Sequence, residues 1–69
     1  MKSPKQIGKT LKKARKEIGL TQVQIAEKVG ISSNYYSMLE TGKRENPGSK
    51  IMTKIAKVLK LSPEDVFPI

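Results

Sequence analysis

The stretch from Gln22 to Leu39, QVQIAEKVGISSNYYSML, decides the fold because it predicts two short helices joined by a tight turn. Ala26 has almost no side chain, so a second helix can approach the first closely at this point. Gly30 lacks a Cβ atom, which allows the chain to turn in a left-handed conformation directly after the first helix. Ser32 can then accept hydrogen bonds from the free N–H groups that open the second helix. The expected product is a pair of helices that cross steeply.

Helical signals flank this stretch on both sides, and no alternation typical of a strand competes with them. Before it, Ser3 is a candidate cap and Pro4 suits the first helical position, while Gly19 is expected to end the helix. After it, Gly42 is expected to stop the third helix, and residues 42–49 form a loop rich in Gly, Asn and Pro. The sequence therefore predicts an all-α bundle of five short helices, at about 4–18, 22–29, 33–41, 50–60 and 63–66.

Apolar residues at helical spacing predict which side of the flanking helices is buried. In the first helix the expected buried stripe is Ile7, Leu11, Ala14 and Ile18. Ser49 is the expected cap of the fourth helix. The inward-facing residues of that helix are expected to be Ile51, Ile55, Val58 and Leu59. There is no repeat or linker, so we expect one domain over residues 1–69, with the paired helices at about 21–41.

The composition of the chain argues against an enzyme, a metal site and a membrane span. Cysteine and histidine are both absent, which removes disulfides, thiolate metal sites and the usual general base. No glycine-rich phosphate loop is present either, so we expect no enzyme, no cofactor and no metal. Apolar runs are short, so neither a membrane span nor a signal peptide is expected, and a cytoplasmic location follows. A net charge of +8 favours a polyanionic partner, although charge also serves solubility.

Five short motifs occur in order along the chain. They are GLTQ (Gly19–Gln22), IAEKVGIS (Ile25–Ser32), Leu39-Glu40 with Gly42-Lys43-Arg44, Asn46-Pro47, and KIAKVLKLS (Lys54–Ser62). Together they resemble the Cro/repressor-type helix-turn-helix family of prokaryotic and phage transcription regulators, over about residues 5–67. The resemblance implies a lambda-repressor-like fold and a sequence-specific regulator that binds double-stranded DNA, expected to be a repressor.

The same resemblance implies that the N-terminal half of the third helix lies in the DNA major groove. The residues expected to contact bases are Ser32, Ser33, Asn34, Ser37 and Met38. The Asn34 amide can donate and accept together, which matches the N6/N7 edge of adenine. The serines discriminate weakly, and Met38 offers an apolar contact to a thymine methyl group. Outside such a motif, these would be ordinary polar surface residues with turn and cap preferences.

Other residues are expected to position the protein on the DNA backbone. By resemblance, the phosphate contacts are Thr21, Gln22, Tyr35, Thr41, Lys43, Arg44 and Lys50. Glu45 departs from the family pattern, because it looks like an extra acidic residue before Asn46-Pro47. The first helix also carries five lysines, which we expect to form a solvated face that adds to the positive field, namely Lys5, Lys9, Lys12, Lys13 and Lys16.

Two charged residues match family positions that form an ion pair between the first and third helices, Arg15 and Glu40. A partly buried pair would orient the third helix without adding much stability. Tyr36 departs from the family, which usually has Ile or Val there. Its ring can fill the same core space, but its hydroxyl then needs a partner or a route to water.

We also expect a symmetric homodimer on a pseudo-palindromic site, because one recognition helix reads too few base pairs for selective binding. The C-terminus is the candidate interface. Val66, Phe67 and Ile69 are three apolar residues within the last four positions. An alternative is that Val66 and Phe67 close the core of their own domain.

The alternative function is an antitoxin that binds both its toxin protein and its own operator. Antitoxins of this type generally need an additional segment for the toxin, whereas the size of this chain suits a restriction–modification controller or a phage regulator better. No effector-binding domain is evident, so no small-molecule ligand is expected.

Overall fold

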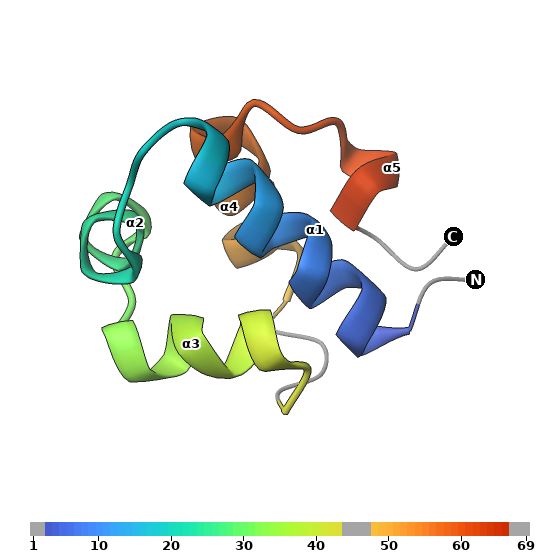
Figure 1. Cartoon of the computed structure of the whole chain (residues 1–69), viewed down its shortest axis with the longest axis horizontal. Coiled ribbons are helices and arrows are strands. Elements are labelled where there is room, and N and C mark those ends of the chain that lie inside the picture. The colour runs from blue at the N-terminus through green and yellow to red at the C-terminus, as the bar shows by residue number, and fades with distance from the viewer. Residues whose placement is uncertain (1–2, 44–47, 67–69) are drawn as a thin grey trace.

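The computed structural model describes residues 3–43 and 48–66, and every regular element within them is a helix (Figure 1). The helices are α1 (Pro4–Glu17), α2 (Gln22–Val29), α3 (Ser33–Thr41), α4 (Ser49–Leu59) and α5 (Pro63–Val66). The all-α prediction is confirmed, and α2, α3 and α5 begin and end at the predicted residues. Within the described ranges, no helix combines the length and the apolar character needed to cross a bilayer.

Local side-chain caps explain where the first three helices begin. The Ser3 hydroxyl accepts a hydrogen bond from the Gln6 backbone N–H, while the Gln6 side chain accepts one from the Ser3 N–H. Thr21 and Gln24 repeat this reciprocal capping box at the start of α2. Ser32 caps α3 by accepting from the Tyr35 N–H at 3.0 Å. These groups satisfy N–H donors that have no partner within the helix.

The turn between α2 and α3 is the one that the sequence predicts. Gly30 has φ +88° and ψ +31°, in the left-handed region that residues with a Cβ atom rarely adopt. The N–H groups of Gly30 and Ile31 both donate to the Ala26 carbonyl oxygen, at 2.8 and 3.0 Å. These bonds close the C-terminus of α2 and turn the chain sharply into α3.

Three predictions at the ends of α1 and α4 were wrong. Helix α1 ends at Glu17, and Ile18 is 38% exposed because the chain turns away at Gly19 before Ile18 can join the buried stripe. Ser49 is the first residue of α4 and not its cap. The cap position belongs to Gly48, whose φ of +99° and ψ of +148° suit glycine alone, and which makes no side-chain cap. Helix α4 ends at Leu59, because Lys60 is left-handed with φ +59°.

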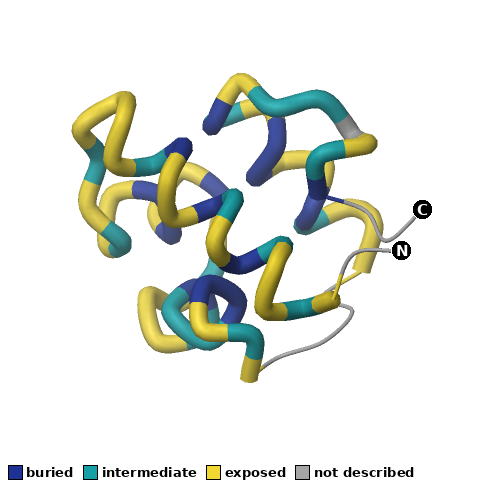
Figure 2. The backbone as a smooth tube through the Cα atoms, turned by 45° about the vertical axis from the view of Figure 1, so that its right-hand side comes forward, coloured by how far each residue is buried: buried dark blue, intermediate teal, exposed yellow. Residues whose placement is uncertain are grey.

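The core lies where α1, α2, α3 and α4 meet, and α5 closes one end of it (Figures 1 and 2). The largest fully buried side chains are Tyr36, Leu11, Ile25, Ile55 and Val66. Most of the predicted inward-facing residues are buried or pack at the edge of this core. Sequence reasoning missed Met52 and Ala56, which are buried on the same side of α4.

The closest approach between α1 and α3 occurs at a glycine. Gly8 is buried in the middle of α1. A Cβ atom at this position would lie 2.7 Å from the Leu39 carbonyl oxygen and closer still to that of Glu40. Because nothing but a hydrogen atom fits there, Gly8 sets the distance at which α1 supports α3.

Candidate nucleic-acid interface

Helix α3 has one polar, accessible side. Ser32, Ser33 and Asn34 are exposed, and Ser37 and Met38 are half-buried. Asn34 stands three and four residues before Ser37 and Met38, so these three lie on the same side of the helix. The structure therefore brings Asn34, Ser37 and Met38 together on one accessible side of α3. Ser32 differs from the others because its hydroxyl oxygen already caps the helix.

The opposite side of α3 is buried. Tyr36 and Leu39 enter the apolar core, and Glu40 is the single charged residue among the buried ones of the described chain. Placing a carboxylate in this position is costly unless partners compensate it. Its contacts therefore decide how firmly α3 is held.

The predicted ion pair between Arg15 and Glu40 is present. The Arg15 Nε atom lies 2.6 Å from Glu40 Oε2, and Arg15 Nη2 lies 3.3 Å from Glu40 Oε1. The side chains are 12% and 2% exposed, respectively, so the pair is nearly sealed from solvent. The remaining guanidinium nitrogen, Nη1, donates to the Leu20 carbonyl oxygen at 2.8 Å. Arg15 thus joins α1, the turn before α2, and α3.

Glu40 has a further partner that the sequence did not reveal. The Gln22 Nε2 atom, in the first turn of α2, donates to Glu40 Oε1 at 3.0 Å. Both carboxylate oxygens are therefore engaged, by two helices. We call Arg15, Gln22 and Glu40 the buried polar network. It fixes α3 against both α1 and α2.

The hydrogen bonds of this network control the charge of Glu40. Burial would raise the pKa of the Glu40 carboxyl, but the hydrogen bonds and the positive charge of Arg15, helped by Gln22, outweigh it and lower the pKa. The hydrogen bond to Glu40 in turn raises the pKa of the Arg15 guanidinium. The network is therefore ionised at neutral pH.

Tyr36 lies against the same network. Its side chain is completely buried, and its hydroxyl oxygen has no hydrogen-bond partner at standard distance and angle. Burial, followed by the proximity of the Glu40 carboxylate, raises the pKa of the Tyr36 phenol far above 10.0. The ring fills core space as predicted. The hydroxyl, however, has neither a hydrogen-bond partner at standard geometry nor access to water.

The structure places the predicted phosphate contacts in different surroundings. Thr21, Thr41, Lys43 and Lys50 are exposed around α3, at the start of α2, the end of α3 and the start of α4. Tyr35 is half-buried and packs against the core. The Gln22 amide nitrogen is occupied by Glu40, which leaves its oxygen and its second N–H for other partners. Arg44 lies outside the described residues.

The sequence and the fold together now place this chain among known proteins. The sequence model of the helix-turn-helix family matches residues 11–66. The chain belongs to this helix-turn-helix family. The resemblance expected from the five motifs is confirmed, and the relatives described below are named as transcriptional regulators or as a restriction-modification controller.

Among curated proteins, this helix-turn-helix chain is similar to the transcriptional regulator SinR of Bacillus subtilis, with 36% identity over 56 residues. That match covers 81% of this chain and 50% of SinR, so the chain spans half the length of this relative. An uncharacterized helix-turn-helix regulator of Archaeoglobus fulgidus is 37% identical over 57 residues, which cover 83% of this chain and 79% of the relative.

Two solved structures share the fold. The restriction-modification controller protein C.AhdI of Aeromonas hydrophila superimposes with a TM-score of 0.83 at 28% identity, covering 93% of this chain and 96% of the controller. The structure of SinR in complex with DNA has a TM-score of 0.79 at 32% identity, covering 87% of this chain and 98% of the SinR chain in that structure. The likeness extends over the helix-turn-helix and the helices that support it.

Of the three residues suggested for a dimer interface, only Val66 lies within the described part of this helix-turn-helix domain. Val66 is 1% exposed and belongs to the core, which agrees with the alternative that it closes its own domain. Phe67 and Ile69 lie outside the described residues. A dimer surface at the C-terminus would therefore depend on these last two apolar residues.

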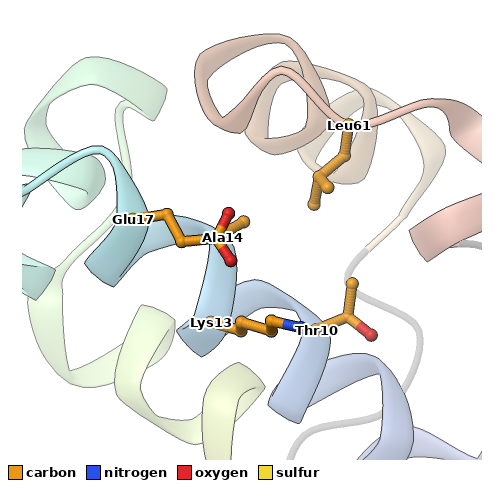
Figure 3. Close-up of a pocket in the computed structure, with 5 residues that line it drawn as sticks. All are labelled: Thr10, Lys13, Ala14, Glu17 and Leu61. Atoms are coloured by element: carbon orange, nitrogen blue, oxygen red, sulfur yellow. The ribbon is translucent and has the colours of Figure 1, made fainter.

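A shallow, open depression of about 310 Å³ lies on another side of the helix-turn-helix domain (Figure 3). It is lined by Thr10, Lys13, Ala14, Glu17 and Leu61. Four of these come from α1, and Leu61 follows α4. None of them belongs to the predicted DNA-contacting set.

Sequence reasoning missed Gly8, Leu20 and Gln22 as residues that support α3. Gln22 was assigned to a phosphate because it opens α2, and no local signal distinguishes that role from a bond to Glu40. Gly8 had a usable signal, because a glycine inside a helical pattern costs stability and so suggests a close packing contact.

Proposed function

We propose that this chain regulates transcription by binding double-stranded DNA sequence-specifically, with α3 in the major groove. The observation that carries the proposal is the asymmetry of α3. Asn34, Ser37 and Met38 lie on one accessible side, while the opposite side is anchored through Glu40. A major groove about 12 Å wide admits one helix, and readout requires side chains held on a rigid support. The solved complex of SinR with DNA supports this proposal.

Within this proposal, different residues carry specificity and affinity. Asn34 is the principal base-reading residue, with Ser32, Ser33, Ser37 and Met38 adding weaker or apolar contacts. The phosphate contacts come from exposed groups on either side of α3, above all Thr21, Lys43 and Lys50. The N-terminus of α2 adds free N–H groups and a positive helix dipole on the same side.

We further propose that the chain acts as a homodimer on a pseudo-palindromic operator, most simply as a repressor that occupies its site. One recognition helix reads too few base pairs for selective binding in a genome. Two copies related by a twofold axis would place their α3 helices about 34 Å apart, which is one turn of DNA. Such a regulator works in the cytoplasm of a prokaryotic cell, where its DNA target lies.

The decisive experiment is selection of bound sites from a pool of random duplexes, followed by sequencing. We expect one enriched motif with twofold symmetry and half-sites about one helical turn apart. For a dimer that neutralises roughly eight phosphates, log K should then fall with log salt at a slope of about −7. No enrichment over the starting pool would overturn sequence-specific binding, and an asymmetric motif would overturn the dimer.

The antitoxin alternative differs by requiring a toxin partner. The relatives described above are named as regulators or as a restriction-modification controller, and this supports a role in regulation. Co-purification of a stoichiometric toxin with the chain would favour the alternative.

A further inference from the structure

Four lysines form a single row along α1. Lys5, Lys9, Lys12 and Lys16 follow one another at spacings of four, three and four residues, which places them on one side of the helix. All four are exposed. At a rise of 1.5 Å per residue, the row is about 16 Å long. We call it the α1 lysine row.

The row is unfavourable for the helix that carries it. Like charges three and four residues apart repel each other. Lys5 also lies in the first turn, where the helix dipole disfavours a cation, and the first turn of α1 contains no acidic residue. Within residues 3–43 and 48–66, no acidic side chain pairs with any of the four. An external anion would relieve both penalties.

The row begins beside the C-terminal end of α3. A Cβ atom on Gly42 would lie 2.8 Å from Lys5 Cγ and 3.0 Å from Lys5 Cα, so the two residues touch. Gly42 directly follows α3 and precedes the exposed Lys43, one of the proposed phosphate contacts. From this point α1 runs away from the C-terminal end of α3 (Figure 1). The row therefore begins at the edge of the surface proposed to face DNA.

We propose that the α1 lysine row binds the phosphate backbone of the same duplex, beside the segment that α3 reads. The inference rests on the proposed DNA binding and adds a contact surface to it. Phosphates follow each other about every 3.4 Å along the helix axis of one strand, so a row of this length faces several of them. Lysines reach phosphates as flexible point charges and carry no base preference, so the row would add affinity without specificity.

A pair of matched variants separates direct contact from the general positive field. Lys9→Gln/Lys12→Gln removes two charges from the row, at a spacing of three residues. Lys13→Gln/Lys60→Gln removes two exposed charges that belong neither to the row nor to the proposed phosphate contacts. Both variants lose the same net charge, and circular dichroism checks that each is folded. Affinity for a random-sequence duplex is then measured as a function of salt.

We expect the row variant to bind with a salt slope less negative by about 1.8 for each bound protomer, because each protomer loses two phosphate contacts. At 0.1 M salt this corresponds to a loss of affinity on the order of fifty-fold per protomer. The control variant should keep the slope of the unaltered chain. Equal slopes in the two variants would overturn the inference while leaving the proposed function intact. If the unaltered chain bound no duplex even at low salt, both would be overturned.

A second measurement tests whether the row holds the same duplex. A bead-bound duplex is saturated with protein and then offered a fluorescent duplex of the same sequence. We expect the row variant and the unaltered chain to capture equally little of the second duplex. Capture that depends on Lys9 and Lys12 would show that the row binds a separate duplex, and this assignment would be wrong.

Discussion

Gln22 Nε2 on α2 donates a hydrogen bond to Glu40 Oε1 on α3 at 3.0 Å, so the first residue of one helix holds the buried carboxylate of the next. Arg15 binds the same carboxylate from α1. The orientation of α3 therefore depends on a charge that three helices share. A charge of this kind contributes little net stability while its partners are present, and removing one partner is expensive.

Replacing Gln22 with Met should weaken the fold while keeping the length and volume of the side chain. Loss of one hydrogen bond to a charged group costs about 1.5–3 kcal/mol in the free energy of unfolding. The measurement is chemical denaturation of Gln22→Met, Glu40→Gln and the double variant. A double-mutant cycle should give a coupling well above zero, and independent effects at the two positions would show that the bond does not form in solution.

Stability should fall in acid because of Glu40. Its folded pKa lies below the unfolded value of 4.5, so the unfolded state binds the proton first and the free energy of unfolding rises with pH through this region. The contribution of Glu40 is present above pH 4.5 and is lost as the pH falls through the folded pKa. The stability difference between the unaltered chain and Glu40→Gln should therefore shrink in acid. A difference that stays constant from pH 7 to pH 2 would contradict the lowered pKa.

Tyr36→Phe should leave the free energy of unfolding unchanged or raise it. The ring keeps its place in the core, and the substitution removes a buried hydroxyl that has no partner at standard geometry. A loss of more than about 1 kcal/mol in Tyr36→Phe would show that the hydroxyl does bind Glu40 in solution.

Gly8→Ala should destabilise the domain although alanine is the better helix former. Alanine gains about 0.5–1 kcal/mol within a helix. Its methyl group would collide with the backbone carbonyls of Leu39 and Glu40, and overpacking of this kind costs about 1–3 kcal/mol. Lys13→Ala, exposed on the same helix, should change stability little. Thermal denaturation distinguishes the two, and a more stable Gly8→Ala variant would mean that α1 and α3 are less close than the structure shows.

Asn34→Ala and Lys43→Ala should weaken DNA binding in different ways. Asn34→Ala is expected to lose about 1–3 kcal/mol on the selected operator and to relax base preference at one position. Lys43→Ala should weaken binding to all sequences evenly and reduce the salt slope by about 1 for each bound protomer. Binding titrations on the operator and on its single-base variants test this. The same uniform loss in both variants would remove Asn34 from base readout.

The sequence by itself determined the features that depend on neighbours in the chain. The caps of α1, α2 and α3 were predictable, because a hydroxyl at the first position bonds to an N–H three residues later whatever the rest of the protein does. The turn at Gly30 was equally predictable, since a left-handed residue after a helix favours glycine. Helical periodicity then placed Leu11 and Ile55 in the core. The family motifs supplied the pairing of Arg15 with Glu40.

Tertiary structure alone decided what depends on distance across the fold. The need for glycine at position 8 becomes clear only from the structure, where the backbone carbonyls of α3 lie against it. The Gln22 side chain points toward Glu40 because the crossing of α2 and α3 puts the buried carboxylate within its reach. A buried charge without hydrogen-bond partners is costly, so this bond is favoured over contacts with solvent. Capping and turn preferences act over a few neighbouring residues and can be read from the sequence. Contacts such as that of Gln22 with Glu40 form only after packing has brought distant residues together.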